Sequence, residues 1–187
     1  MKILKKLLGK LIRILYRFVY RFIPCQEKTI LFISFHGRGY SDNPMAIHQY
    51  LSKHSQYADY RCIYAIKNHK QKKLKIENAR IIEYFSIAYF FYLARSKYWI
   101  ANCKLPKYVL KKDSQVYLQT WHGTPLKKLA HDIEVPEGTT FYRSEMSVEE
   151  MRSTYDNDVS KYNYMISPSA FTTEVFQSAF AIERERL

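Results

Sequence analysis

The sequence predicts an α/β fold in which a parallel β-sheet carries helices on both faces. After Pro24, short apolar runs typical of strands alternate with longer segments typical of helices, and no internal repeat, low-complexity tract or Gly/Ser linker interrupts them. Strands connected through helices form βαβ units, so their strands are parallel and the sheet is covered on both faces. With 187 residues, 47% of them hydrophobic, the chain has the length of one domain and enough apolar side chains for its core.

The predicted strands and helices begin at residue 29. Runs rich in β-branched and aromatic residues predict strands, and apolar residues at helical spacing predict helices. The expected strands are 29–35, 60–66, 80–84, 98–102, 116–120 and 164–167, and the expected helices are 44–53, 86–95, 125–131 and 168–180. The aromatic residues of 84–92 are expected to pack inside the domain rather than to stack on nucleic-acid bases.

The first 24 residues are predicted to form a separate amphipathic helix that lies on a membrane surface. On a helical wheel the bases form one stripe and the apolar residues form the opposite arc. The bases are Lys2, Lys6, Lys10, Arg13, Arg17 and Arg21, and the apolar residues are Leu4, Leu7, Leu8, Leu11, Leu15, Phe18 and Phe22. Because a base recurs every three or four residues, neither a secretory signal nor a membrane span fits. Each base near an anionic leaflet contributes roughly 1 kcal/mol. The alternative is a helix packed on its own domain with a solvated basic face.

The charge balance predicts an anionic partner. The chain has 30 Lys and Arg against 17 Asp and Glu, a net charge of +13. A lipid surface, a nucleic acid, or a phosphorylated small molecule or polymer would all fit, and charge alone does not choose among them. The three cysteines are far apart in the sequence and form no C-x-x-C motif, so we expect neither a disulfide framework nor a zinc site, and a reducing cytosolic setting. No metal or other cofactor is expected.

Three predicted strand-to-helix junctions should meet at the carboxyl edge of the sheet, where open α/β folds bind ligands. Each places a capping residue before a proline, at Asn43-Pro44, Thr124-Pro125 and Ser167-Pro168. Two junctions also contain an aromatic residue followed by His-Gly, with the histidines at positions 36 and 122. We therefore expect both histidines at one edge, each near a helix N-terminus that attracts phosphate.

His122 is the candidate catalytic residue, because an imidazole can take a proton while nearby cations hold phosphate oxygens. The candidate substrate- and phosphate-binding residues are His36, Gly37, Arg38, Gly123, Thr124, Lys127, Lys128 and Ser167. The two lysines could equally belong to a solvated helix face. The loop around Arg38 could cradle a phosphate, but it lacks the lysine and the spacing of a P-loop. The remaining histidines are expected to be structural; they are His48, His54, His69 and His131.

Four segments of the sequence resemble one known family. They are SFHGRGYSDNPMAIHQYL, SKYWIANC, VYLQTWHGTPLKKLAHDI and YMISPSAFTTEVFQSAF, in this order, between about Lys28 and Ile182. They are similar to the amino-terminal half of the CDP-glycerol glycerophosphotransferases, the teichoic-acid primases and polymerases of Gram-positive bacteria. The resemblance implies one Rossmann-like domain of a two-domain GT-B enzyme at the cytoplasmic face of the cell membrane. It also implies transfer of glycerol phosphate from CDP-glycerol to a hydroxyl acceptor on a lipid-linked saccharide or polymer, with His122 as the favoured general base.

The sequence also departs from this family. Its members continue after the SAF segment into a second domain that carries most of the nucleotide site and another essential histidine, whereas the sequence ends at Leu187. The predicted domains are therefore an amino-terminal helix at 1–24 and one Rossmann-like domain at 25–187. We expect part of a glycerophosphotransferase or, alternatively, a truncated and inactive remnant that binds membrane or polymer. The 187 residues alone are expected to release no CMP from CDP-glycerol. Nucleic acid is not an expected partner, because no nucleic-acid-binding motif accompanies the charge.

Overall fold

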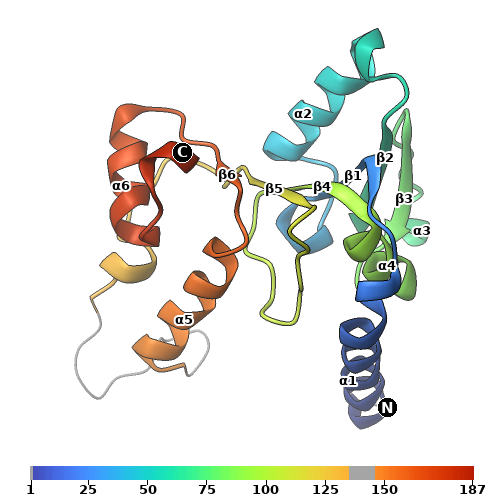
Figure 1. Ribbon diagram of the computed structural model, residues 1–187, viewed down its shortest axis with the longest axis horizontal. Helices are drawn as coiled ribbons and strands as arrows, with labels where there is room; N and C mark the ends of the chain where they lie inside the picture. Colours follow the sequence, from blue (N-terminus) through green and yellow to red (C-terminus); the bar gives the residue numbers. More distant parts are fainter. Residues whose placement is uncertain (1, 135–145) are drawn as a thin grey trace.

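A six-stranded parallel sheet forms the centre of the computed structural model. The structure describes residues 2–134 and 146–187, and it describes their side chains except at 2–9, 12 and 72. The strands lie in the order β3-β2-β1-β4-β5-β6. Their bounds are β1 Gln26–Ile33, β2 Arg61–Ile66, β3 Ala79–Glu83, β4 Ser96–Ala101, β5 Val116–Gln119 and β6 Tyr164–Met165. The helices are α1 Lys2–Val19, α2 Asp42–Lys53, α3 His69–Lys72, α4 Ile87–Arg95, α5 Val148–Val159 and α6 Ala170–Phe180. The predicted α/β class with a parallel sheet is confirmed (Figure 1).

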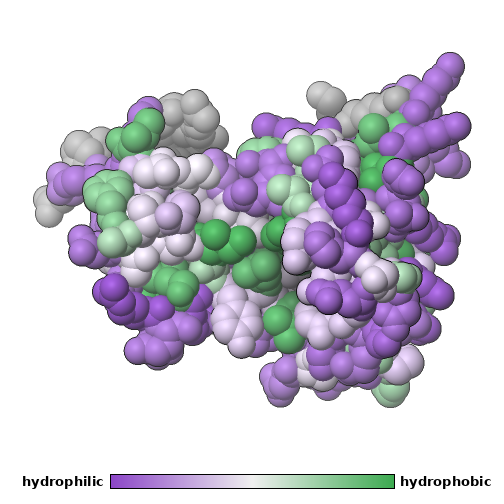
Figure 2. All heavy atoms as spheres, turned by 90° about the horizontal axis from the view of Figure 1, so that it is seen from above, coloured by the Kyte–Doolittle hydropathy of each residue, from purple (hydrophilic) through white to green (hydrophobic). Residues whose placement is uncertain are grey.

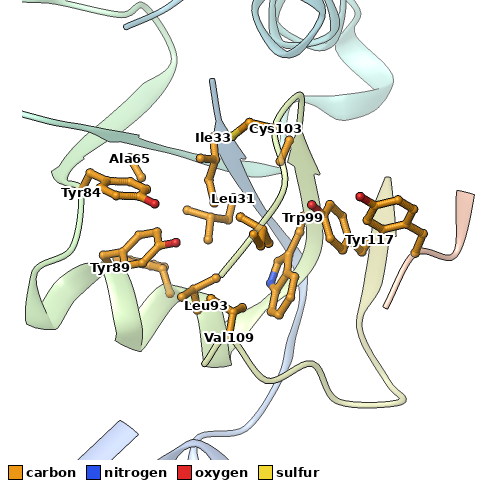
Figure 3. Packing of buried hydrophobic residues seen from close by; sticks show 14 of the residues in the cluster. Leu31, Ile33, Ala65, Tyr84, Tyr89, Leu93, Trp99, Cys103, Val109 and Tyr117 are labelled. Carbon is orange, nitrogen blue, oxygen red and sulfur yellow. The ribbon is translucent and has the colours of Figure 1, made fainter. Parts of the chain in front are cut away.

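The central strands are apolar on both faces, as parallel strands between two helical layers require. Leu31 of β1 pairs in register with Ile63 of β2 and Trp99 of β4, and all three side chains are fully buried. On this face they pack against α4, where Tyr89 and Leu93 are also fully buried (Figure 3). Of the aromatic residues expected to be buried in this region, Tyr84, Tyr89, Phe90 and Tyr92 are buried in the core, whereas Phe85 is partly buried and Phe91 is 39% exposed.

The other face of the sheet packs against α2. Phe32 of β1 stacks on Tyr64 of β2 with ring centroids 5.2 Å apart, and the buried His48 of α2 lies edge-on to Phe32. Farther along the sheet, Leu118 and Tyr164 contribute to an apolar hollow of about 330 Å³ beside α2. Figure 2 shows hydrophobic residues gathered in a hollow between the part of the chain that carries α6 and the part that carries α2.

One predicted helix, 125–131, is wrong. The chain runs on from Thr124 without forming a helix and makes a single 3-10 turn at Ala130–Asp132. Tertiary packing explains the difference: Ala130 is fully buried with a left-handed φ of 41°, a conformation that no α-helix contains. The sequence interpretation also missed α5, although Ser147 and Glu150 form a capping box of the S-x-x-E type.

The expected helix caps are wrong as well. Ser41 precedes α2, which places Asn43 inside the helix rather than at its start. At α6 the cap is Ser169, whose hydroxyl accepts from the Thr172 N–H at 3.2 Å, so Ser167 lies outside the helix. The cap of α2 thus lies two residues before the expected position, and the cap of α6 lies two residues after it.

Among the residues of the amino-terminal helix α1 whose side chains are described, those on one side dock on the domain. Tyr16 is 2% exposed, its hydroxyl donates to the Leu110 carbonyl at 2.9 Å, and its ring lies 5.1 Å from Phe90 of α4. The other side carries four apolar residues with exposed fractions of 57–70%, namely Leu11, Ile14, Leu15 and Phe18, and Phe22 of the 3-10 turn that follows, Tyr20–Phe22, is 76% exposed. The helix therefore packs on its own domain and still presents an apolar side, so Tyr16 belongs to the core although it precedes the predicted boundary at residue 24. Within 2–134 and 146–187 no helix combines the length and the apolar character that a membrane crossing requires.

This docking predicts a large loss of stability for one aromatic substitution on α1 and almost no change for another. Tyr16→Ala should lower the free energy of unfolding by about 3–5 kcal/mol, because it removes a buried ring. Phe18→Ala should change it by less than about 0.5 kcal/mol, because Phe18 is 70% exposed. Urea titrations followed by circular dichroism measure both variants. Indistinguishable midpoints would show that α1 contributes nothing to the core.

Candidate active site at the carboxyl edge of the sheet

The strand order reverses between β1 and β4, because the chain builds the sheet outward to β3 and then returns to the other side of β1. In open α/β sheets the loops diverge at such a point and leave a crevice beyond the carboxyl ends of the strands, where ligands bind. His36 follows β1, Asn102 follows β4 and His122 follows β5. The predicted placement of both histidines at one edge is confirmed.

A backbone carbonyl fixes the tautomer of His122. Its Nδ1 atom lies 2.5 Å from the carbonyl oxygen of Asn102. Because a carbonyl oxygen can only accept, Nδ1 must carry the proton that is donated. The neutral ring then has its lone pair on Nε2, which is the atom that can take a proton from a substrate.

Two aromatic rings hold the His122 imidazole in place. Trp121 stacks on it with centroids 4.5 Å apart and planes inclined by 27°, and Phe35 approaches it edge-on at 5.6 Å. Trp121 is itself packed 4.9 Å from Phe180 of α6. Trp121 and Phe35 both have left-handed φ angles, 51° and 44°, which cost free energy in residues with side chains. The same unusual conformation thus precedes both candidate histidines.

Asn102 forms hydrogen bonds to several of the loops at this edge. Its side-chain oxygen accepts from the Phe35 N–H at 2.8 Å, and its amide group donates to Asp42 at 2.5 Å. Nearby, Asn43 donates to the Thr120 carbonyl at 3.2 Å. The sequence interpretation did not select Asn102, Asp42 or Asn43 as functional residues. For Asn102 a signal existed, because it is a polar residue that directly follows the apolar strand β4.

A pocket of about 260 Å³ opens beside His122. Gly123 and Thr124, both predicted to bind substrate, line it together with His122. Its other lining residues are Asp42, Asn43, Thr120, Trp121, Ile166, Pro168 and Phe176. Ser167 lies between two of them in the chain, and its hydroxyl is hydrogen-bonded to that of Thr173 at 2.7 Å.

His36, Gly37 and Arg38 form the second part of the edge and do not line this pocket. The backbone N–H of His36 donates to the Cys103 sulfur at 3.1 Å. Burial lowers the pKa of the His36 ring, and the nearby charges lower it further; these come from Lys67, Arg38, Lys104 and His122. Since its ordinary pKa is already below 7, His36 is neutral at pH 7.

The structure does not bring Lys127 and Lys128 into the pocket. Both side chains are exposed, and Lys128 forms an ion pair with Glu134 on the surface. Both lysines were expected to bind phosphate from a helix that starts at Thr124, and that helix does not form. A helix N-terminus at Thr124 or at Ser167 is likewise not available to attract phosphate.

The histidines expected to be structural do have structural partners. His48 is hydrogen-bonded to Tyr40, His54 to the Tyr50 carbonyl, His69 to Glu83 and His131 to Asp156. Cys25, Cys62 and Cys103 are free thiols. The described part of the chain contains no cluster of three or more His, Cys, Asp or Glu residues that could hold a metal ion.

The comparison with known families supports the resemblance seen in the four segments. The sequence model of the CDP-Glycerol:Poly(glycerophosphate) glycerophosphotransferase family matches residues 14–187. The chain belongs to this family. It is 38% identical over 165 residues to the teichoic acid poly(glycerol phosphate) polymerase of Bacillus spizizenii, covering 87% of this chain and 40% of the relative. To the teichoic acid glycerol-phosphate transferase of Staphylococcus aureus it is 34% identical, covering 84% and 39%.

Solved structures of a family member share the fold. The wall teichoic acid polymerase TagF superposes with a TM-score of 0.84 at 34% sequence identity, covering 94% of this chain and 41% of TagF. A variant of TagF soaked with CDPG gives the same TM-score and coverage. The matched part of TagF thus has the same α/β architecture as this chain. The chain spans about two fifths of the length of these relatives.

The loop that carries His36 predicts a contrast between two glycines. Gly37 has a φ of +80°, and a Cβ atom there would lie 2.7 Å from Tyr84, so Gly37→Ala should lower the free energy of unfolding by about 3 kcal/mol. Gly39 has open space around it, so Gly39→Ala should change it by less than about 1 kcal/mol. Thermal unfolding measures both. Equal stability of the two variants would mean that the loop adopts another conformation in solution.

Proposed function

We propose that this chain supplies the general base of a glycerophosphotransferase, which moves glycerol phosphate from CDP-glycerol to a hydroxyl group on a lipid-linked saccharide or teichoic-acid chain. The observation that carries the proposal is the 2.5 Å contact between His122 Nδ1 and the Asn102 carbonyl, which leaves Nε2 as a proton acceptor beside the pocket. Family membership supports the choice of donor and acceptor class.

The proposed reaction is a single in-line displacement at phosphorus. The acceptor hydroxyl gives its proton to Nε2 of His122 while its oxygen attacks the phosphorus atom that bears glycerol. The bond from that phosphorus to the bridging oxygen breaks, and CMP leaves with the bond's electron pair. A base in this position typically contributes roughly 10²–10⁴-fold to the rate. Gly123 and Thr124 offer a backbone N–H and a hydroxyl at the pocket to neighbouring phosphate oxygens.

The proposal assigns residues 25–187 to the Rossmann-like amino-terminal domain of a two-domain GT-B transferase. The covered share of the relatives supports this assignment, because the matching segment is about 40% of their length. In the proposed enzyme a second domain holds most of the nucleotide, and His122 faces it from the carboxyl edge. Among the predicted phosphate-binding residues, His36, Gly37, Arg38, Gly123 and Thr124 keep a role in this proposal.

A chimaera tests the role of His122. The matching 165-residue segment of the Bacillus spizizenii polymerase is replaced by the corresponding part of this chain, and CMP release from CDP-glycerol is measured. His122→Ala should lower the rate by at least about 10²-fold, because no other group takes the proton. The matched control is His54→Ala, which removes an exposed histidine bonded only locally to the Tyr50 carbonyl. The control should retain the activity of the chimaera.

The same substitutions are then made in the 187-residue chain to separate catalysis from folding. The His122 side chain is exposed, so its loss should leave the melting temperature within a few degrees of the original. A large drop in melting temperature would indicate a structural histidine instead. Near-normal transfer by the His122→Ala chimaera would refute the base assignment.

The proposal also places the chain on an anionic membrane surface, at the cytoplasmic face of the cell membrane. The exposed apolar side of α1 can insert among lipid chains, and two exposed bases lie near it, Arg17 on α1 and Arg21 in the 3-10 turn Tyr20–Phe22 that follows. The cytoplasmic leaflet carries the negative lipids that such bases attract. Docking through Tyr16 leaves this side of the helix accessible.

Vesicle binding tests this placement. The 187-residue chain should sediment with anionic vesicles more than with neutral ones, and added salt should weaken the binding. The double change Phe18→Ser and Phe22→Ser should lower the partition coefficient about tenfold or more, because two apolar rings no longer leave water. Phe171→Ser is the matched control, since Phe171 is 58% exposed on α6, and should have little effect. Equal sedimentation with neutral and anionic vesicles would contradict the electrostatic part of the proposal.

A further inference from the structure

A basic residue lies just beyond the carboxyl end of each of four adjacent strands. In the order of the sheet these are Lys67 after β2, His36 after β1, Lys104 after β4 and His122 after β5. Arg38 follows two residues after His36. The strands differ in length and sequence, yet the same kind of residue lies at the end of each one. Lys67 and Lys104 were not among the residues selected from the sequence.

The packing holds Lys67 and Lys104 in this row. The backbone N–H of Lys67 donates to the Gly37 carbonyl at 2.7 Å, and its Nζ lies 4.9 Å from the centre of the Tyr84 ring. Tyr84 is the ring that leaves no room for a side chain at Gly37. On the other side of His36, the Nζ of Lys104 donates to the Thr154 hydroxyl at 2.6 Å and lies 3.7 Å from the centre of the Tyr155 ring.

Bases outnumber acids along the row, and two of the acids near this edge already have partners outside it. Asp42 accepts from Asn102, and Glu83 accepts from the Asn68 N–H and from His69. Asp158 is fully buried and accepts from the Tyr162 hydroxyl at 2.6 Å, and its charge interacts with Lys161 and with Lys104 of the row. Like charges held close together cost free energy that a bound anion recovers. The arrangement therefore favours an anionic ligand that extends along the edge.

The length of the row fits several phosphates in sequence. Adjacent strands lie ~4.8 Å apart, so the distance from β2 to β5 is about 14 Å. A glycerol phosphate unit adds six backbone bonds, twice as many as an amino-acid residue, so phosphorus atoms along an extended chain are roughly 7 Å apart. Three consecutive phosphates would match the row, with one end beside His122.

We propose that Lys67, His36, Arg38 and Lys104 form a track that binds the phosphodiester chain of the acceptor and directs its terminal hydroxyl to His122. This inference rests on the proposed function, and it specifies which substrate the edge receives: a polyanionic acceptor of at least about three phosphates rather than the donor nucleotide. Because the neutral His36 ring keeps an N–H, it serves as a hydrogen-bond donor between the fixed charges.

The test measures binding of synthetic glycerol phosphate oligomers of one to five units to the 187-residue chain by fluorescence anisotropy. Affinity should rise up to three units and then level off. Lys67→Gln should weaken binding of the three-unit oligomer about fivefold, because an exposed charge pair is lost. Lys53→Gln is the matched control: it makes the same change of charge at the end of α2, at the opposite edge of the sheet, and should weaken binding less than twofold. Circular dichroism confirms that both variants are folded.

Three results would overturn the track. The first is equal weakening by Lys67→Gln and Lys53→Gln, which would show general charge attraction. The second is equal weakening of CDP-glycerol binding by Lys67→Gln, which would assign the row to the donor diphosphate. The third is tighter, Lys67-dependent binding of an oligouridylate with the same number of phosphates, which would favour nucleic acid. None of them depends on CMP release, so the track can fail while the role of His122 stands, and the reverse is equally possible.

Discussion

The arrangement of the candidate site depends on one buried asparagine. Asn102 follows β4 at the point where the strand order reverses, and each side of it contacts a different loop. Its side chain joins the backbone after β1 to the start of α2, and its own carbonyl orients the ring that follows β5. A buried amide with its hydrogen-bonding groups satisfied has few alternative positions, because each would leave a polar group without a partner. This rigidity lets three loops from distant parts of the sequence form one surface.

Backbone strain accompanies this arrangement. Phe35, His36 and Trp121 all have left-handed φ angles, which side chains disfavour, and they lie in the two loops that contain the candidate histidines. Strained residues persist only where the surrounding structure determines their conformation. Here the surrounding structure consists of the Asn102 hydrogen bonds and the packing of Trp121 against α6. The carboxyl edge is therefore maintained by the core beneath it.

Much of the fold could be predicted from the sequence, because apolar periodicity determines which segments are buried. The strands from β1 to β5 and the helices α2 and α4 are strongly patterned, and they were placed correctly within a few residues, as was the shared edge of His36 and His122; the short helix α3 was not predicted. The helix expected after Thr124 failed because a proline after a capping residue is a local signal, whereas the burial of Ala130 is a tertiary effect. Lys67 and Lys104 could not be selected either. The role proposed for them depends on strand order, which places residues 67, 36, 104 and 122 next to one another although no sequence spacing relates them.

In the proposed reaction, the carbonyl that holds His122 also determines how the base recovers between turnovers. With Nδ1 committed to Asn102, a proton accepted from a substrate hydroxyl can leave only from the nitrogen that received it. The doubly protonated ring cannot pass the proton inward through the sheet, as a relay with a carboxylate on its far side would do. In the proposed enzyme, the extended acceptor would therefore have to move away from Nε2 before water removes the proton and the next hydroxyl approaches. Regeneration of the base is thereby coupled to movement of the product, so the release of one acceptor end prepares the site for the next.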